Sequence, residues 1–282
     1  MSLPNLENLC ITARSAPPIL LIHLSIQAGA SLSLKFSLSG NGSLVLSYLP
    51  KSLNNLSNLS RITTISLYLG SGQSSVRLNG PSGEFYIGGN RACEGGHQDG
   101  ATSLFLRSLG KFDISRSRWL AVKRLIYRPQ AATQITAYPL YQTLHSMEDL
   151  RTLTITQSNN LPFILTLNPN KNPDEIVLCP KLEVITFYIE RPDRRHLDEL
   201  LSMAEERALR GAKLSGITIV SQRTLLPTEL FQLRKHVSHV EYKLDRALPA
   251  WDAHPELPPC NSLFYLELSS LLLPRSEFEV GI

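Results

Sequence analysis

Long apolar runs are missing from this sequence of 282 residues. No stretch approaches the roughly 18 apolar residues that a transmembrane helix needs. The best candidate, Ile19–Ile26, is eight residues long and contains His23. Because Glu7 and Arg14 precede it, it is a poor match to a signal peptide. We therefore expect a soluble protein of the cytoplasm or nucleus that does not contact membranes.

Cysteine is scarce, which argues against a disulfide framework and a zinc site. Cys10, Cys93, Cys179 and Cys260 are far apart, and no Cys-x-x-Cys occurs. Cys93 and His97 share one segment, but a pair lacks the other two ligands that zinc requires. We expect four reduced thiols and no metal site.

Motifs for catalysis and cofactor binding are also absent. The segment Gly70-Ser71-Gly72 follows a predicted strand, but no third glycine and no P-loop lysine accompany it. The Gly-x-Ser-x-Gly spacing of a nucleophile elbow does not occur. No histidine has an identifiable catalytic partner. The sequence therefore predicts no catalytic residue and no cofactor, and we expect a protein that is not an enzyme.

Negative charge is rare in the first ninety residues, where Glu7 and Glu84 are the only acidic residues. The whole chain carries a formal net charge of +4. The densest basic group combines five cations with two aromatic residues: Arg116, Arg118, Trp119, Lys123, Arg124, Tyr127 and Arg128. Such a group is typical of a solvated edge, and it also suits contact with RNA or an acidic peptide.

One spaced pattern recurs eight times: an apolar residue, two others, an apolar residue, one other and an apolar residue. Its members are Leu6/Leu9/Ile11, Ile62/Ile65/Leu67, Val122/Leu125/Tyr127, Leu150/Leu153/Ile155, Leu182/Ile185/Phe187, Leu214/Ile217/Ile219, Val237/Val240/Tyr242 and Leu263/Leu266/Leu268. The first members lie 56, 60, 28, 32, 32, 23 and 26 residues apart, so the two long gaps are about twice the short ones. Repetition at about this interval is typical of leucine-rich repeats.

The spacing has a physical explanation. The last two apolar residues of each unit are two apart, so in a strand they point to the same side. One unit cannot bury that side alone, and neighbouring units must stack. The pattern predicts an α/β fold: a leucine-rich-repeat-like solenoid, or horseshoe, with a parallel concave sheet and helices on the convex side.

The two long gaps predict altered units. Residues 32–38 alternate strictly between apolar and polar, which indicates a strand in the first gap. In the second gap, two short apolar runs flank Asn-Gly-Pro-Ser-Gly at 79–83, which predicts an inserted β-hairpin at about 74–90. Small and polar residues at about 88–101 predict a flexible loop.

Residues 1–247 are thus expected to form one irregular solenoid. In its second half, Asp193 can cap a helix that stops at Gly211, and Thr228–His236 predicts a second helix. Four prolines between 248 and 261 indicate a linker. We expect residues 248–282 to form a Pro-rich linker and C-terminal tail with one candidate capping repeat.

The concave face is the best place to look for a binding site, because a solenoid presents it as a long surface. Its outward residues follow from the strand alternation, and those chosen as partner-binding candidates are Arg124, Arg128, Thr154, Thr156, Tyr188, His239, Glu241 and Lys243. Tyrosine and arginine commonly anchor protein interfaces, whereas threonine also reflects strand propensity.

Five segments of the chain carry a family resemblance: residues 3–9, 28–36, 78–83, 179–186 and 200–207. Together they resemble the C-terminal part of the F-box proteins that are expanded in mushroom-forming (basidiomycete) fungi. In that family an N-terminal F-box binds the Skp1 adaptor of a cullin ubiquitin ligase, and the repeats recruit a target. The resemblance therefore implies an intracellular substrate receptor of an SCF-type ubiquitin ligase.

This sequence departs from the family plan at its start. Met1 lies directly before a repeat, so we expect Skp1 and cullin to be reached only through an F-box absent from this chain. The expected function is target recruitment to the ligase if an F-box is supplied. Two alternatives remain: a nucleic-acid-binding repeat protein that uses the patch Arg116–Arg128, and a truncated product without selected function.

Overall fold

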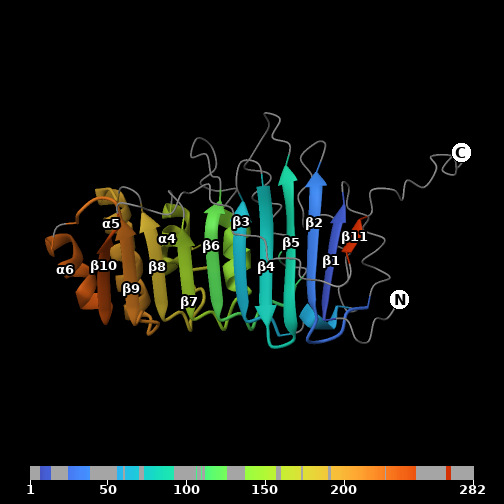
Figure 1. The fold of residues 1–282 in the computed structure, drawn as a ribbon. Coiled ribbons are helices and arrows are strands. Elements are labelled where there is room, and N and C mark those ends of the chain that lie inside the picture. The colour runs from blue at the N-terminus through green and yellow to red at the C-terminus, as the bar shows by residue number, and fades with distance from the viewer. Residues whose placement is uncertain are drawn as a thin grey trace, which may run out of the picture.

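The computed structural model describes residues 7–13, 25–38, 56–59, 61–69, 73–91, 106, 109, 112–125, 137–156, 160–172, 174–189, 192–225, 227–245 and 265–267. Their fold is mixed α/β, with a large, mostly parallel sheet and few helices. The sheet forms one layer, and the helices lie behind it on one face (Figure 1).

A single sheet contains the eleven described strands, in the order β10-β9-β8-β7-β6-β3-β4-β5-β2-β1-β11. Their bounds are β1 (Asn8–Ala13), β2 (Ser31–Leu38), β3 (Thr64–Leu69), β4 (Gln73–Gly80), β5 (Gly83–Arg91), β6 (Trp119–Leu125), β7 (Thr152–Thr156), β8 (Val184–Ile189), β9 (Gly216–Ser221), β10 (His239–Leu244) and β11 (Tyr265–Glu267). Neighbouring strands are parallel except at β4, which is antiparallel to both β3 and β5.

The helices of the described chain lie mainly behind the β10 half of the sheet (Figure 1). They are α3 (Ala137–His145), α4 (Leu161–Leu167), α5 (Arg194–Leu209) and α6 (Pro227–His236), with two short 3-10 helices, η2 (Ser57–Leu59) and η3 (Pro169–Lys171). We name the opposite face of the sheet, which none of these helices covers, the open face.

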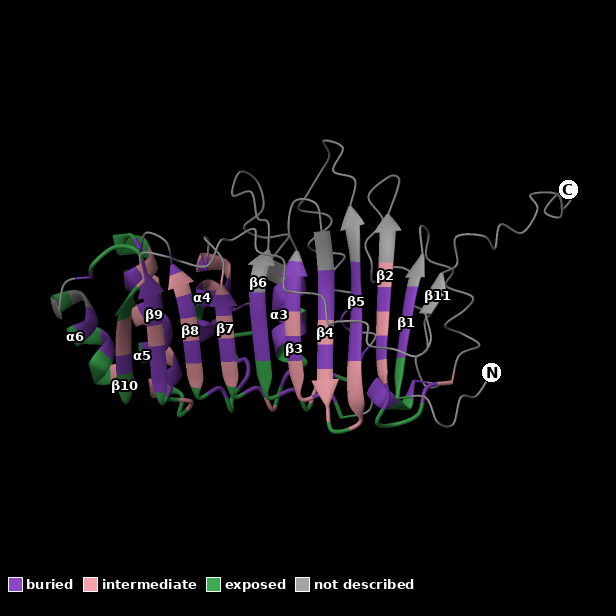
Figure 2. Ribbon diagram, in the orientation of Figure 1, coloured by how far each residue is buried: buried purple, intermediate pink, exposed green. Residues whose placement is uncertain are grey.

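Apolar side chains alternate with polar ones along the strands, and the apolar set forms the core. In β7, Leu153 and Ile155 are fully buried, while the threonines beside them are partly exposed. Ile185 and Phe187 of β8 repeat this arrangement in register with them. Figure 2 shows the resulting alternation of buried and intermediate residues along the two strands. Apolar columns thus run across the sheet beneath the helices.

The register predicted for the third unit is wrong. Leu120 and Val122 are the buried pair of β6, since Leu120 lies opposite Leu153. Val122 therefore ends its unit and does not begin it. The first position belongs to Ser117, which is fully buried and donates from Oγ to the carbonyl oxygen of Ile62 at 3.5 Å. A search restricted to apolar residues could not recognise a hydrogen-bonded serine there.

The predicted hairpin lies inside a three-stranded meander that runs through the sheet in reverse order. β4 and β5 pair with Gly80 opposite Gly83, and β3 pairs with the other edge of β4. As a result β5 lies beside β2, and β3 lies beside β6. Glycine is required at position 80, because a Cβ there would lie 2.4 Å from the carbonyl oxygen of Arg61.

Two other predicted segments are only partly described. Of the loop expected at about 88–101, residues 88–91 belong to β5, the second strand of the predicted hairpin, and residues 92–101 lie outside the described chain. Of the expected linker and tail, 248–282, only β11 is described. It pairs in parallel with β1, with Cys10 opposite Tyr265, at the end of the sheet remote from β10 (Figure 1).

Backbone hydrogen bonds join the turns that precede successive parallel strands. The carbonyl oxygen of Arg118 accepts from the amides of Arg151 and Thr152, both at 2.9 Å. The same two-donor arrangement recurs one unit further on at Arg151 and again at Glu183. Units from β6 to β9 are therefore equivalent in backbone geometry as well as in sequence spacing.

Helix α5 begins and ends where the sequence predicts. The carboxylate of Asp193 accepts a hydrogen bond from the amide of His196 at 2.8 Å, and this bond holds the pKa of Asp193 below its ordinary value. Gly211 follows the last turn with φ of 78°, in the left-handed region that glycine adopts easily. The cap is thus charged at neutral pH, at the positive end of the helix dipole.

A buried cation also ties α5 to the sheet. Arg207 is the largest fully buried side chain, and its guanidinium donates to the carbonyl oxygens of Leu178 at 2.7 Å and Cys179 at 3.0 Å. Cys179 has φ of 47°, an unusual value for a residue with a side chain. Burial lowers the pKa of Arg207 to about 10, which leaves it charged at neutral pH. The cation therefore holds the turn that leads into β8.

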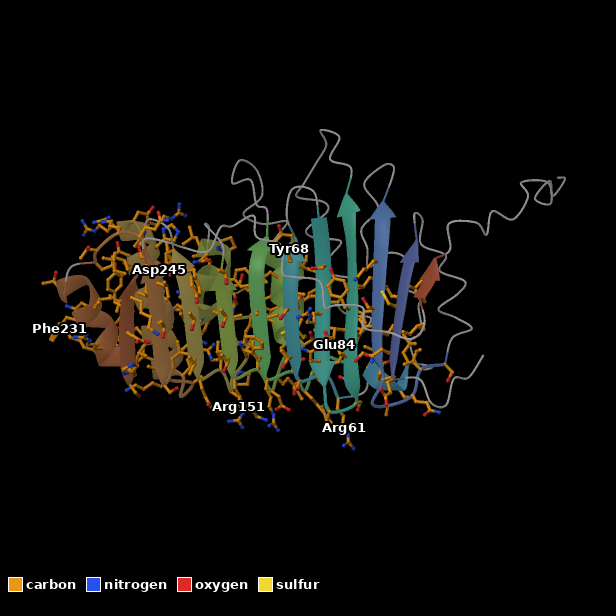
Figure 3. All side chains as sticks on the ribbon, viewed as in Figure 1. Arg61, Tyr68, Glu84, Arg151, Phe231 and Asp245 are labelled. Carbon is orange, nitrogen blue, oxygen red and sulfur yellow. The ribbon has the colours of Figure 1, made fainter. Side chains whose placement is uncertain are left out.

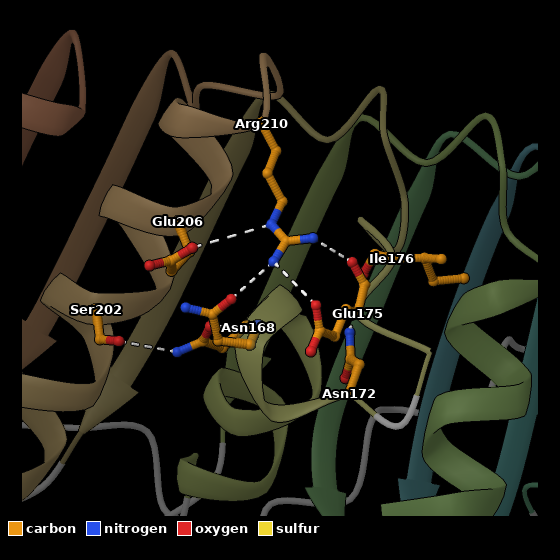
Figure 4. A network of polar contacts seen from close by, with 8 residues as sticks. Asn168, Asn172, Glu175, Ile176, Ser202, Glu206 and Arg210 are labelled. Carbon is orange, nitrogen blue, oxygen red and sulfur yellow. Dashed lines mark hydrogen bonds and ion pairs between the residues drawn. The ribbon is translucent and has the colours of Figure 1, made fainter.

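Polar contacts fix the end of α5 to the connection before β8 (Figure 4). Arg210 donates to Asn170 Oδ1 at 2.7 Å and to the carbonyl oxygen of Glu175. About two helical turns earlier in α5, the hydroxyl of Ser202 accepts a hydrogen bond from Asn168 Nδ2 at 3.0 Å. These contacts lie on the helical side of the sheet, so they involve no side chain of the open face.

Replacing Phe187 by alanine is expected to lower the free energy of unfolding by about 3–5 kcal/mol, because it removes a fully buried ring from an apolar column. Thr186→Ala, one residue away on the open face, is the matched control and should change it by less than about 1 kcal/mol. Chemical denaturation followed by circular dichroism measures both. Equal effects would contradict the assignment of the two faces.

Asp193→Ala is expected to lower the free energy of unfolding by about 1 kcal/mol at neutral pH through loss of the helix cap. Since the folded-state pKa of Asp193 is depressed, its contribution is present above the ordinary aspartate pKa and disappears as pH falls through the folded value. The difference between wild type and variant should therefore shrink on acidification. A constant difference across the acid range would show that the carboxylate charge plays no part.

Candidate functional site

Side chains on the open face form rows that run across the strands. The middle row, read from the strand registers, consists of Cys10, Ser33, Tyr86, Arg77, Ser66, Ala121, Thr154, Thr186, Thr218 and Glu241. Short hydroxyl side chains predominate toward β9, while larger and charged ones occur on β4 and β5. The open face therefore changes chemical character along its length.

The structure brings six of the eight predicted binding residues onto this face: Thr154, Thr156, Tyr188, His239, Glu241 and Lys243. Thr156 lies opposite Tyr188, whose ring is partly exposed. At the β10 edge, the hydroxyl of Thr218 donates to Glu241 Oε2 at 3.4 Å, and Lys243 Nζ lies 3.1 Å from the same carboxylate oxygen. Glu241 is thus already engaged by two neighbours.

The remaining two predicted residues are not placed on this surface. The backbone of Arg124 lies in β6 opposite Tyr68, after an irregularity in the register between Leu67 and Tyr68. Nothing further is described of its side chain, and Arg128 lies outside the described residues. Both were predicted from the third unit, whose register the structure corrects.

Sequence reasoning missed a group centred on Arg77 of β4. Its Nε lies 3.1 Å from Glu84 Oε1, and its guanidinium carbon lies 5.9 Å from the centroid of the Tyr86 ring. Tyr86 is only 3% exposed, and burial raises the pKa of its phenol. Gly88 leaves room for the ring, since a Cβ there would lie 2.2 Å from the Tyr86 hydroxyl. The cation is thereby held between a carboxylate and an aromatic face.

A signal for this group exists in the hairpin turn. With Gly80 opposite Gly83, the antiparallel register places Arg77 directly opposite Tyr86, and Asn79 opposite Glu84. Counting outward from the predicted turn would have found the pair. The partner strands on either side, β3 and β2, could not be inferred, because the meander reverses the strand order.

Trp119 also lies on the open face, although the sequence did not identify it as a binding residue. It begins β6 between Thr64 of β3 and Thr152 of β7, and 39% of it is exposed. Tyr68, also on β3, is 6% exposed, and Figure 3 shows it and Glu84 on the central strands. The centre of the open face therefore carries tryptophan, tyrosine and arginine.

Arginines also line the edge of the sheet at the start of the parallel strands. Arg61, Arg116 and Arg118 are exposed there, and Figure 3 shows Arg61 and Arg151 extending from this edge. Arg151 forms a 2.5 Å ion pair with Glu183, so the edge is not uniformly basic. Lys181 similarly donates to Asp149 at 2.6 Å, and this bond lowers the pKa of Asp149.

The described residues contain no group of three or more histidine, cysteine, aspartate or glutamate side chains that could hold a metal ion. Cys179 is buried, and burial raises the pKa of its thiol to about 12, so the thiol stays protonated at neutral pH. No helix in the described part of the chain is long and apolar enough to cross a membrane.

Comparisons with family models, curated proteins and solved structures find no match to this chain. The partly exposed arginine and tryptophan of the open face lie among short side chains on a surface built from strands, an arrangement suited to contact with another macromolecule.

Arg77→Ala is expected to lower the free energy of unfolding by no more than about 1 kcal/mol, because the Arg77–Glu84 pair is about one third exposed and exposed ion pairs contribute little. Thermal and chemical denaturation measure the change. A loss of several kcal/mol would instead identify Arg77 as a structural residue and remove it from the candidate binding surface.

Proposed function

We propose that this chain is a protein-binding module, built as a leucine-rich-repeat-like solenoid whose open face recognises a target. The observation that carries the proposal is the exposure of Arg77 and Trp119 at the centre of that face, with Arg77 packed over the buried Tyr86 ring. Arginine and tryptophan are among the residue types that most often dominate the binding free energy of protein interfaces.

The repeat architecture is supported by the turns and the core together. Each strand from β6 to β9 contributes one buried apolar pair in register with the next, and the turns before them repeat one backbone hydrogen-bond arrangement. Asn160 adds a side-chain contact between units, donating to the carbonyl oxygen of Tyr188 at 3.2 Å. Stacked units of this kind present extended binding surfaces.

Resemblance to fungal F-box proteins suggests what such binding achieves. The module would recruit a target protein to an SCF-type ubiquitin ligase, with the F-box, and through it Skp1 and cullin, supplied by another polypeptide or segment. In this role the open face contributes target specificity and performs no chemistry itself.

Nucleic-acid binding is the second candidate function, and the exposure of Arg61, Arg116 and Arg118 on one edge favours it. Phosphate contacts release counterions, so binding of this kind weakens steeply with salt. The ion pairs of Arg151 and Lys181 on the same edge reduce its net positive charge. For that reason we place protein binding first.

The test compares three forms of the chain as bait in extracts of its source cells: wild type, an open-face variant with Arg77→Ala and Trp119→Ala, and a control variant with Glu205→Ala on the exposed surface of α5. Loss of one hot-spot side chain costs about 2 kcal/mol or more, which corresponds to roughly thirtyfold weaker binding. Quantitative mass spectrometry should therefore show a protein that wild type and the control retain and the open-face variant loses.

Other outcomes separate the alternatives. Co-purification of Skp1 and a cullin with the wild-type chain would support the ligase role, and their absence together with a retained target would reduce the proposal to a stand-alone binding module. Retention of RNA that is lost at moderate salt would favour the second candidate. A set of bound proteins that is identical for all three forms would overturn open-face recognition.

A further inference from the structure

The end of the sheet formed by β10 is built to accept another strand. β10 is the first strand in the sheet order, so its outer edge has no described strand beside it. An edge strand presents a row of unpaired N–H and C=O groups, which other strands can pair with. Neighbouring β9 already pairs with β10 in parallel through six residues, from His239 to Leu244.

Apolar side chains are exposed at this same end. Phe231 of α6 is 58% exposed, and Leu244 at the end of β10 is 44% exposed. Figure 3 shows Phe231 at the β10 end of the molecule, beyond the last strand. Lys235 lies 5.5 Å from the centroid of the Phe231 ring and covers it only in part. A further unit packed here would bury both side chains.

Among the described residues one strand follows β10, namely β11, but it pairs with β1 at the opposite end of the sheet (Figure 1). Ten strand spacings separate β10 from β11, which amounts to about 48 Å. Twenty residues, 245–264, connect the two strands. A flexible chain of this length has an average end-to-end distance of about 25 Å and a maximum of about 70 Å. The separation of β10 and β11 in one copy is therefore about twice the average reach of a chain of this length.

The same connection has the ordinary length for a step to the neighbouring strand. Residues 222–238 connect β9 to β10, and residues 190–215 connect β8 to β9, so the lengths are 17 and 26 residues. Twenty residues fall between these values. By chain length alone, β11 suits the position beside β10, as the next parallel strand after a crossover connection.

We propose that copies of this chain associate head to tail, with β11 of one copy lying between its own β10 and β1 of the next copy. The pairing of β11 with β1 stays as the structure has it, but β1 now belongs to a second molecule. The proposal does not depend on target binding by the open face.

Charge supports this arrangement. In the backbone register Glu267 is paired with Thr12, two residues after Cys10 of the middle row, and Lys243 of β10 comes two residues after Glu241 of the same row. If this register continued past β10, Glu267 would lie opposite Lys243. Directly opposed residues of opposite charge stabilise a strand pair. The contact is heterologous, because a β10 end meets a β1 end, so association can continue into a ring or a longer chain.

The first test is self-association of the full chain, measured by sedimentation velocity over a wide range of protein concentration. Wild type should form species larger than a monomer as concentration rises. Phe231→Glu should raise the dissociation constant at least about tenfold, because it places a charge in the newly buried contact. Leu209→Glu is the matched control: Leu209 is 74% exposed at the end of α5, the helix that precedes β9, and its variant should associate as wild type does.

A disulfide trap tests the position of β11 itself. In the variant Lys243→Cys with Glu267→Cys, the two cysteines lie on strands ten spacings apart in the single copy, so they can be oxidised to a link only when β11 lies beside β10. Thr12→Cys with Glu267→Cys is the control, because those residues are already opposite each other. Peptide mass spectrometry identifies either link.

We expect the disulfide of the Lys243→Cys/Glu267→Cys variant to form in a yield that rises with protein concentration. The yield should fall when Phe231→Glu is added to the same variant. A chain that stays monomeric at every concentration, with the control link formed and the other absent, would overturn the proposal. Association without the β10–β11 link would overturn it equally, since the contact would then use another surface.

Discussion

The structure depends on one constraint: each strand has two apolar side chains, two residues apart, that must both face the helical side of the sheet. Each pair must also lie in register with the apolar pair of the next strand. Leu120 and Val122, Leu153 and Ile155, and their counterparts in β8 and β9 satisfy this condition without a break. A shift of one residue in any strand would turn its pair to the open face. The turn hydrogen bonds, the buried Arg207 and the Ser117 hydroxyl all act to hold that register.

Much of this order could be read from the sequence, because hydrophobic periodicity is a local property. The strands of the second half, the cap at Asp193 and the stop at Gly211 all follow from neighbouring residues. The reversed order of β3, β4 and β5 does not, since it depends on which distant edges meet. The pattern of apolar residues also could not identify Ser117 as the first position of its unit, because Ser117 is polar and its burial is compensated by a hydrogen bond. Whether the units curve into a horseshoe stays a prediction.

The candidate site shows the same division. Thr154, Thr156 and Tyr188 could be assigned to one face from alternation alone, and the structure places them there. Arg77 and Tyr86 owe their proximity to an antiparallel turn, and Trp119 owes its neighbours to a pairing between β3 and β6. The residues with the greatest capacity for binding thus come from the irregular part of the repeat array, while the regular part supplies a uniform background of hydroxyl groups.

Pairing between β1 and β11 joins residues that are 255 positions apart, such as Cys10 and Tyr265. At about 5–20 residues per second, a ribosome releases β1 roughly 13–50 s before β11 is complete. During that interval Leu9 and Ile11 lie at an edge that β11 of the same chain cannot yet cover. Few charges surround them in the first ninety residues to discourage wrong pairing. The order of synthesis therefore leaves the N-terminal edge open to wrong pairing until a partner strand arrives.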